Sequence, residues 1–186
     1  MAASLAATRA GWHATVFERA PVFSEVGAGV QLGPNVTRIL QAWGLGDALQ
    51  QVAAFPSGLH ARSLTTGEVL ATLPLTDAVQ TYGAPYVTIH RADLHGLLLQ
   101  AAAHAGVQVH SDAVVQRTHL SPDAVQLEVM QHGQLQHHTS AAAVAADGVW
   151  SPLRQQLLGD GLPHFTGHIA YRALVAQSDL PAHLRS

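Results

Sequence analysis

The chain has 186 residues with 48% hydrophobic and 11% charged side chains, a composition that indicates a folded globular chain and excludes a disordered one. Its formal net charge of -3 at pH 7 argues against nucleic acid as a partner. This sequence has no cysteine, which excludes disulfides and thiolate chemistry, and no apolar run is long enough to cross a bilayer, so we expect a cytoplasmic protein without a membrane partner.

The first predicted elements are a helix, a glycine, a strand and an acidic residue. Residues 2–9 are rich in alanine and predict a helix, and Gly11 lies where a glycine commonly ends one. Residues 12–20, WHATVFERA, predict a strand that closes on Glu18. This order is the second half of a βαβ unit, in which an acidic residue at the strand end accepts hydrogen bonds from an adenosine ribose. A surface glutamate that merely ends a strand is the alternative.

The stretch SEVGAGVQLGPN, residues 24–35, contains G-x-G followed by Gly33. A phosphate-binding G-x-G-x-x-G turn must follow a buried strand and open a helix at once. Polar residues precede this stretch, and Gly33-Pro34 delays the next helix. The pattern therefore predicts a loop that bears glycines and not the dinucleotide fingerprint. An NAD-only dehydrogenase, which would need this loop as its phosphate turn, has the least support.

The rest of the chain alternates between helical and strand patterns, which predicts an α/β fold. In the first half of this region we expect a helix at 36–43, a hairpin at 58–75 that turns at TTGE, a strand at 86–90 and a helix at 91–106. Antiparallel strands within 107–141 follow, with a turn near Gly133. The last expected elements are a buried parallel strand at 141–148, a helix at 151–159 with Ser151 as its N-cap, and a strand at 168–176.

Six stretches occur in the order TVFERAP, VGAGVQLGPN, AWGLGDAL, YVTIHRADLHGLL, AADGVWSPLRQQLLG and FTGHIAYRALV. Together they resemble the flavin-dependent aromatic hydroxylases, the group A FAD monooxygenases, most closely the branch acting on salicylate, 3-hydroxybenzoate and 6-hydroxynicotinate. The resemblance covers essentially the whole chain. It implies a Rossmann-like FAD-binding domain of the aromatic hydroxylase type with part of a β-rich substrate domain.

The resemblance also implies a division of the chain. Residues 1–55 and 85–163 would form two segments of the FAD-binding domain, residues 56–84 a hairpin of the substrate domain, and residues 164–186 its truncated start. The strand and G-x-G-x-x-G turn at the family's N-terminus have no counterpart, nor does its C-terminal half. We therefore expect a fragment of the family's fold, in which no catalytic residue is assigned.

Cofactor-binding residues follow from the resemblance, position by position. Glu18 matches the acid that holds the ribose of the FAD adenosine, and Arg91 matches an arginine near the pyrophosphate and ribityl chain. The remaining matches are Arg19 beside Glu18, Gln31 in the glycine-bearing loop, Val115 whose backbone would touch the adenine, Asp147-Gly148 in a motif that serves FAD and the nicotinamide cofactor, and Arg154 in the following helix.

Several of these residues also have a purely structural interpretation. Arg91 would pair with Asp93, Asp147 would only form a tight turn with Gly148, and Arg154 would be a solvated helix residue.

The 13 histidines raise the question of a metal site, but their spacings argue against one. No H-E-x-x-H sequence occurs, and no predicted helix carries a histidine pair one turn apart. His137 and His138 are neighbours on a predicted strand, so their rings point to opposite faces. We therefore expect no metal, and we expect His132, His137 and His138 to face solvent.

The function implied by the resemblance is FAD-dependent hydroxylation of a small aromatic compound, salicylate-like or hydroxynicotinate-like, with NADH or NADPH as the electron donor. The partners would be that substrate and further copies of the chain in a homo-oligomer. The alternative is a non-catalytic remnant of the same fold that binds FAD weakly or not at all.

Overall fold

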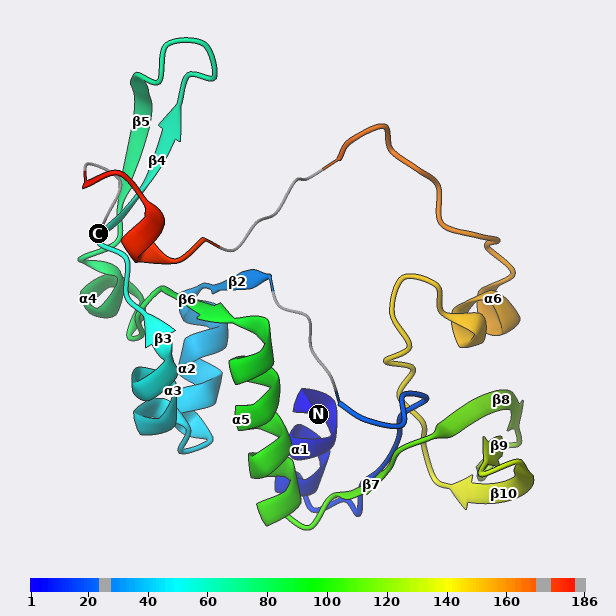
Figure 1. Cartoon of the computed structure of the whole chain (residues 1–186). Coiled ribbons are helices and arrows are strands. Elements are labelled where there is room, and N and C mark those ends of the chain that lie inside the picture. The colour runs from blue at the N-terminus through cyan, green and yellow to red at the C-terminus, as the bar shows by residue number, and fades with distance from the viewer. Residues whose placement is uncertain (24–27, 170–174, 183–186) are drawn as a thin grey trace. The chain divides into compact units, whose positions relative to one another are not determined.

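The computed structural model describes residues 1–23, 28–169 and 175–182 (Figure 1). The chain separates into two compact units, the first formed by Met1–Phe23 and Ala102–Tyr171 and the second by Ser24–Ala101 and Arg172–Ser186. Helices and strands alternate along the chain, so the α/β class is confirmed. Among the residues described, no helix combines the length and apolarity that crossing a bilayer requires.

The helices are α1 (Ala2–Arg9), α2 (Pro34–Ala42), α3 (Gly46–Val52), α4 (Ala78–Tyr82), α5 (Arg91–His104) and α6 (Pro152–Leu158), with a short 3-10 helix η1 (Gln177–Asp179). The strands are β1 (Thr15–Phe17), β2 (Gly29–Leu32), β3 (Ala53–Ala54), β4 (Gly58–Arg62), β5 (Val69–Pro74), β6 (Val87–His90), β7 (Gln108–His110), β8 (Ala113–Leu120), β9 (Val125–Gln131) and β10 (Gln134–Ser140). The sequence patterns do not predict helices α3 and α4.

The first unit contains two strand assemblies. Strand β1 pairs in parallel with β7, and β8, β9 and β10 form an antiparallel sheet in the order β10-β9-β8. The expectation of antiparallel strands within 107–141 is therefore confirmed for β8, β9 and β10 but wrong for β7, which pairs in parallel. The chain turns at Asp112, whose φ of 51° is left-handed, and this turn separates β7 from β8.

Strands β9 and β10 are joined by the two-residue turn His132–Gly133, which confirms the turn expected near Gly133. Both residues have positive φ, 50° and 75°. A type I′ hairpin requires positive φ at both central positions, and its twist matches that of the flanking strands. The turn sets Gln131 opposite Gln134.

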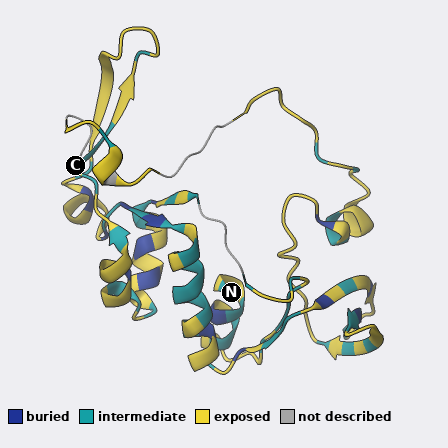
Figure 2. Ribbon diagram, in the orientation of Figure 1, coloured by how far each residue is buried: buried dark blue, intermediate teal, exposed yellow. Residues whose placement is uncertain are grey.

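The second unit is built around β6, which lies between β2 and β3 in an antiparallel sheet. Val87 and Ile89 of β6 are almost fully buried, and they pack with Leu32, Leu40 and Leu49. Figure 2 shows buried segments of the ribbon in dark blue in this part of the chain. The expectation that residues 29–32 belong to a loop is wrong. Their run of Gly-Val-Gln-Leu pairs with residues 87–90, a partner that only the tertiary fold supplies.

Helix α2 begins at Pro34, two residues earlier than expected, because proline fits the first helical position. Thr37 in this helix is fully buried, and its Oγ1 donates to the Pro85 carbonyl oxygen at 2.6 Å. This hydrogen bond ties α2 to the segment that leads into β6.

The expected hairpin at 58–75 is confirmed as β4 and β5. Most of its residues are exposed on both faces, as the largely yellow ribbon in Figure 2 shows. Leu70 and Leu73 are 70% and 58% exposed. A two-stranded hairpin without a packed face is marginally stable by itself.

The buried parallel strand expected at 141–148 does not form. These residues are exposed, and none of them pairs in a ladder with another of the described residues. An Ala-rich run has weak strand preference, so it needs neighbouring strands to become one. The last expected strand, 168–176, has its centre outside the described residues.

The expected helix at 151–159 is confirmed as α6, with its predicted ends. The Ser151 side chain accepts a hydrogen bond from the Arg154 N–H at 2.9 Å, Pro152 is the first helical residue, and Gly159 ends the helix with a φ of 63°. The ends of α1 and α5 also agree, because Gly11 and Gly106 have φ values of 88° and 82° where those helices stop.

Candidate functional site

Glu18 directly follows β1, as the sequence predicts. Its backbone N–H donates to the His110 carbonyl oxygen at 2.8 Å, and its own carbonyl oxygen accepts from the Ala113 N–H at 2.9 Å. The carboxylate is also oriented, because Oε1 accepts from the Ala20 N–H at 2.8 Å. The half-buried Glu18 side chain therefore has one oxygen engaged by its own turn, and its acceptor capacity exceeds that single bond.

Val115 lies in β8, two residues after the Ala113 amide that binds Glu18. The β8–β9 register shifts between Val115 and Arg117, so one extra residue, Gln116, interrupts the ladder. Such a bulge bends a strand and re-aims its backbone groups. Arg19, beside Glu18, is exposed.

An aromatic cluster lies beside Glu18 in the first unit. The Phe17 ring stacks on His110, with centroids 5.4 Å apart, and lies 4.7 Å from the tilted His138 ring. His138 is half-buried, so the expectation that it faces solvent is wrong. Its neighbour His137 is exposed, as is His132. The alternation of faces is predicted by the sequence, but the aromatic partner of His138 comes from a strand more than 100 residues away, which no local pattern indicates.

Asp147 and Gly148 form the turn that precedes α6. The Asp147 Oδ2 accepts from the Leu153 N–H at 3.2 Å, and Gly148 has a φ of 80°, which glycine adopts without strain. Partial desolvation alone would raise the pKa of the largely exposed Asp147 carboxyl. Hydrogen bonds from the Ser151 side chain and the Leu153 amide outweigh this desolvation, so the pKa lies below its ordinary value. The nearby Arg154 charge adds to this lowering.

Arg154 projects from the first turn of α6, and its Nε lies 3.1 Å from Asp160 Oδ2. The structure therefore gives this arginine an acidic partner. A cavity of about 340 Å³ is lined by the predicted residues Asp147, Gly148 and Arg154, together with Ser151 and apolar side chains. Three of the predicted cofactor-binding residues thus line the same cavity. A cavity of about 350 Å³ in the second unit is lined by none of the predicted residues.

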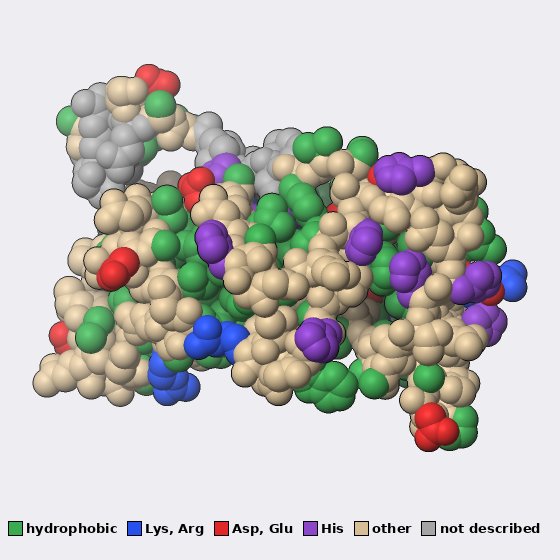
Figure 3. Space-filling view, turned by 90° about the horizontal axis from the view of Figure 1, so that it is seen from below, with side chains coloured by type: hydrophobic (Ala, Val, Ile, Leu, Met, Phe, Trp, Pro, Cys, Tyr) green, Lys and Arg blue, Asp and Glu red, His purple; other side chains and the backbone are tan. Residues whose placement is uncertain are grey.

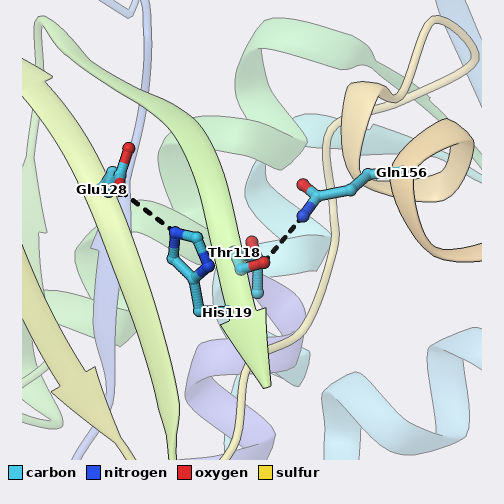
Figure 4. A network of polar contacts seen from close by, with 4 residues as sticks. All are labelled: Thr118, His119, Glu128 and Gln156. Atoms are coloured by element: carbon cyan, nitrogen blue, oxygen red, sulfur yellow. Dashed lines mark hydrogen bonds and ion pairs between the residues drawn. The ribbon is translucent and has the colours of Figure 1, made fainter.

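Helix α6 is tied to the sheet of the first unit by the Gln156 side chain, which Figure 4 shows. Gln156 Nε2 donates to the Thr118 carbonyl oxygen of β8 at 2.7 Å. On the other side of the strand, His119 reaches Glu128 of β9, with Nε2 and Oε1 3.1 Å apart. No sequence pattern indicates the role of Gln156, because its acceptor is 38 residues away. This tie holds the Arg154 helix against β8.

Arg91 and Gln31 belong to the second unit. Arg91 is the first residue of α5, directly after β6, and its backbone N–H donates to the Ala28 carbonyl oxygen at 3.2 Å. Gln31 is an exposed residue of β2 and pairs with Thr88 of β6. Gln31 thus lies in β2, and Arg91 directly follows β6, the strand that pairs with β2 in the same small sheet.

Histidine side chains, purple in Figure 3, appear at several separate places on the face shown. No group of three or more histidine, aspartate or glutamate side chains within the described ranges is arranged to hold a metal ion.

Comparisons with known proteins identify the family of the chain. A family model described as FAD binding domain matches residues 1–179. The chain is 37% identical to 3-hydroxybenzoate 6-hydroxylase 1 from Aquipseudomonas alcaligenes over 100% of this chain and 47% of that protein. It is 36% identical to 6-hydroxynicotinate 3-monooxygenase from Pseudomonas fluorescens over 92% of this chain and 44% of that protein.

Among solved structures, p-nitrophenol 4-monooxygenase PnpA from Pseudomonas putida DLL-E4 superposes with a TM-score of 0.73 at 20% identity, over 81% of this chain and 39% of that one. This likeness confirms the predicted fold class. The chain spans about half the length of the curated relatives it matches.

Proposed function

This chain belongs to the FAD-binding domain family, and we propose that it is part of an FAD-dependent monooxygenase that hydroxylates a small aromatic compound. The named relatives act on 3-hydroxybenzoate and 6-hydroxynicotinate, which supports a substrate that is a hydroxylated aromatic acid or a close analogue. NADH or NADPH would supply the electrons. FAD, when bound, provides the redox chemistry that activates oxygen for the hydroxylation.

The single observation that carries this proposal is the setting of Glu18. Its carboxylate stands at the carboxyl end of a parallel strand, where nucleotide ligands bind in α/β sheets. Oε1 is held by the Ala20 amide, so the carboxylate has a defined orientation and spare acceptor capacity. A carboxylate so placed suits the two hydroxyls of a ribose, which are donors. The residues present therefore fit the adenosine part of FAD.

The other predicted residues take roles that match their chemistry. Arg91 would bind the diphosphate as a permanently charged, multi-donor group. Asp147 and Gly148 would contact the cofactor in the cavity that they share with Arg154, where Gly148 lets a ligand approach the backbone closely. The backbone of Val115 would touch the adenine, and Gln31 and Arg19 would add polar contacts. No residue of this chain is assigned to proton transfer with the substrate.

The division into FAD-binding segments 1–55 and 85–163 and substrate-domain segments 56–84 and 164–186 is part of the proposal. So are a cytoplasmic location and assembly of the whole protein into a homo-oligomer.

The test is a titration of FAD and FMN into the wild-type chain and the Glu18→Gln variant. FMN lacks the adenosine ribose, so it serves as the internal control. We expect the Kd for FAD to rise about 10- to 100-fold, because hydrogen bonds to a charged group contribute roughly 1.5–3 kcal/mol. The Kd for FMN should not change. Glu68→Gln, at the exposed tip of the β4–β5 hairpin, is the control for the loss of one negative charge. An unchanged FAD Kd in Glu18→Gln would refute the proposed role.

The second candidate is a non-catalytic remnant that holds FAD weakly. One observation favours it: residues 141–148 are exposed and have no ladder partner among the described residues. Adding FAD to the purified chain, desalting it and recording the visible spectrum separates the two candidates. A flavin band at stoichiometric level excludes the weak-binding remnant, and its complete loss supports it.

A further inference from the structure

The turn that carries Glu18 is fastened to the segment between β7 and β8. Three backbone hydrogen bonds join the two: Glu18 N–H to the His110 carbonyl oxygen at 2.8 Å, Ala113 N–H to the Glu18 carbonyl oxygen at 2.9 Å, and Asp112 N–H to the Ala20 carbonyl oxygen at 3.1 Å. The Ala20 amide in turn holds the Glu18 carboxylate. The orientation of that carboxylate therefore depends on where residues 110–113 lie.

Residues 111 and 112 are themselves held by the last residue of β9, Gln131, and by the first residue of the following turn, His132. Gln131 Nε2 donates to the Ser111 carbonyl oxygen at 3.1 Å in a partly buried setting. His132 Nδ1 lies 3.3 Å from Asp112 Oδ2. Gln131 pairs with Ala113 in the β8–β9 ladder. It therefore lies opposite a residue only two positions from Ser111.

The two ties differ in strength. The His132 and Asp112 side chains are 74% and 50% exposed, and a polar contact between such exposed groups is weakened because water competes for both partners. The hydrogen bond from the Gln131 side-chain amide to the Ser111 carbonyl oxygen is partly buried. Removing the amide would leave this carbonyl without that donor, which costs free energy. Asp112 also has a left-handed φ of 51°, a conformation that the surrounding contacts must hold in place. Gln131 is therefore the stronger of the two supports.

We propose that Gln131 is a positioning residue for the Glu18 carboxylate and acts through the Ser111 carbonyl and the Asp112 and Ala20 backbone. The proposal rests on the proposed role of Glu18 for its consequence in cofactor binding. The geometric part, that Gln131 positions the turn at residues 18–20, does not depend on cofactor binding. Gln131 itself is assigned no contact with the cofactor.

The geometric part is tested without ligand, by NMR on the full chain. Methionine is close to glutamine in size and cannot donate, so Gln131→Met removes the bond to Ser111 with little change in volume. We expect the Ala20 amide resonance to shift and its hydrogen exchange to accelerate about 3- to 10-fold. This is the fold-change that corresponds to losing the stabilisation from one neutral hydrogen bond. Gln126→Met, on the same strand, is the matched control and should leave Ala20 unchanged. An Ala20 amide that responds equally to both variants, or to neither, overturns the proposal.

The consequence for binding is tested by a double-mutant cycle with FAD as the probe and FMN as the control. We expect Gln131→Met to raise the Kd for FAD about 3- to 10-fold in the wild-type background and to have no further effect in the Glu18→Gln background. A merely structural loss would weaken FAD binding equally in both backgrounds and would also weaken FMN binding.

The cycle separates the two ways in which the prediction can fail. If Glu18→Gln does not weaken FAD binding, or if the wild type binds no FAD, the proposed function fails and the Ala20 amide alone decides the role of Gln131. If Glu18→Gln weakens FAD binding but Gln131→Met does not, the positioning role fails and the proposed function stands.

Discussion

Glu18 and Asp147, two acidic residues of the first unit, are positioned in different ways. Glu18 follows β1, and its backbone is hydrogen-bonded on both sides by residues 110–113. Asp147 follows an exposed stretch that forms no strand, and its carboxylate is engaged by the turn that opens α6. The backbone of Glu18 is thus held by residues about 90 positions away, and its carboxylate by the Ala20 amide, whereas Asp147 is held only by contacts within six residues. A local cap can therefore orient a side chain where no ladder supports it.

Breaking the ladder beside Glu18 gives the largest expected effect. The Gln108 N–H donates to the Ala14 carbonyl oxygen at 3.1 Å, and proline has no N–H. We expect Gln108→Pro to lower the free energy of unfolding by about 2 kcal/mol or more, from the lost bond and the carbonyl left without a donor. Urea denaturation measures the change, and Gln108→Ala, which keeps the amide, is the control. A wild-type denaturation midpoint for Gln108→Pro would show that the β1–β7 pairing does not stabilise the unit.

Removing the cap beside Asp147 should have a smaller effect. The Ser151 side chain accepts from the Arg154 N–H, and losing such an N-cap costs about 1 kcal/mol. We expect Ser151→Ala to accelerate hydrogen exchange of the Arg154 amide, whereas Ser151→Thr retains an acceptor and should preserve most of the protection. Equal exchange in Ser151→Ala and wild type would mean that the helix end is stabilised in another way.

The tie between α6 and β8 is expected to contribute about 0.5–1.5 kcal/mol. Gln156→Met removes the donor to the Thr118 carbonyl oxygen at nearly constant volume. Its expected result is faster amide exchange throughout α6 with unchanged exchange in β9. Gln155→Met, at the exposed neighbouring position, is the control. If both variants behave alike, the bond shown in Figure 4 does not fasten the helix.

The smallest expected effect is the pH dependence of the Asp147 turn. Because the pKa of the folded carboxyl is lowered, its contribution to stability is fully present above the unfolded value of about 3.9 and is lost as the pH falls through the lower folded value. Thermal denaturation between about pH 5 and pH 2 should therefore show an acid-dependent loss in the wild type that is reduced in Asp147→Asn. The same pH dependence in both proteins would contradict the lowered pKa.

The sequence predicts elements that depend on local contacts, and it fails where an element depends on distant contacts. The ends of α1, α5 and α6 are predicted correctly because each depends on a nearby residue, such as Gly11, Ser151 or Gly159. The hairpin at 58–75 is predicted because its turn residues are adjacent to its strands. Residues 29–32 form a strand, and residues 141–148 do not, because strand formation depends on partners elsewhere in the chain.

The candidate site divides in the same way. The place of Glu18 at a strand end and the cap at Ser151 are predicted from neighbouring residues. The bond from Gln131 to Ser111, the stacking of Phe17 on His110 and the tie from Gln156 to Thr118 join residues 20 or more positions apart. A single sequence carries no signal for such contacts, because each side chain alone is an ordinary polar or aromatic residue on a strand or helix.

The most direct test of the proposal that Glu18 binds the adenosine ribose of FAD is an NMR titration of the isotope-labelled full chain with FAD. We expect the Ala20 and Ala113 amide resonances, which report on the two sides of Glu18, to shift with FAD and not with FMN. If FAD binds while both resonances stay in place, the nucleotide lies elsewhere and the role proposed for Glu18 is wrong.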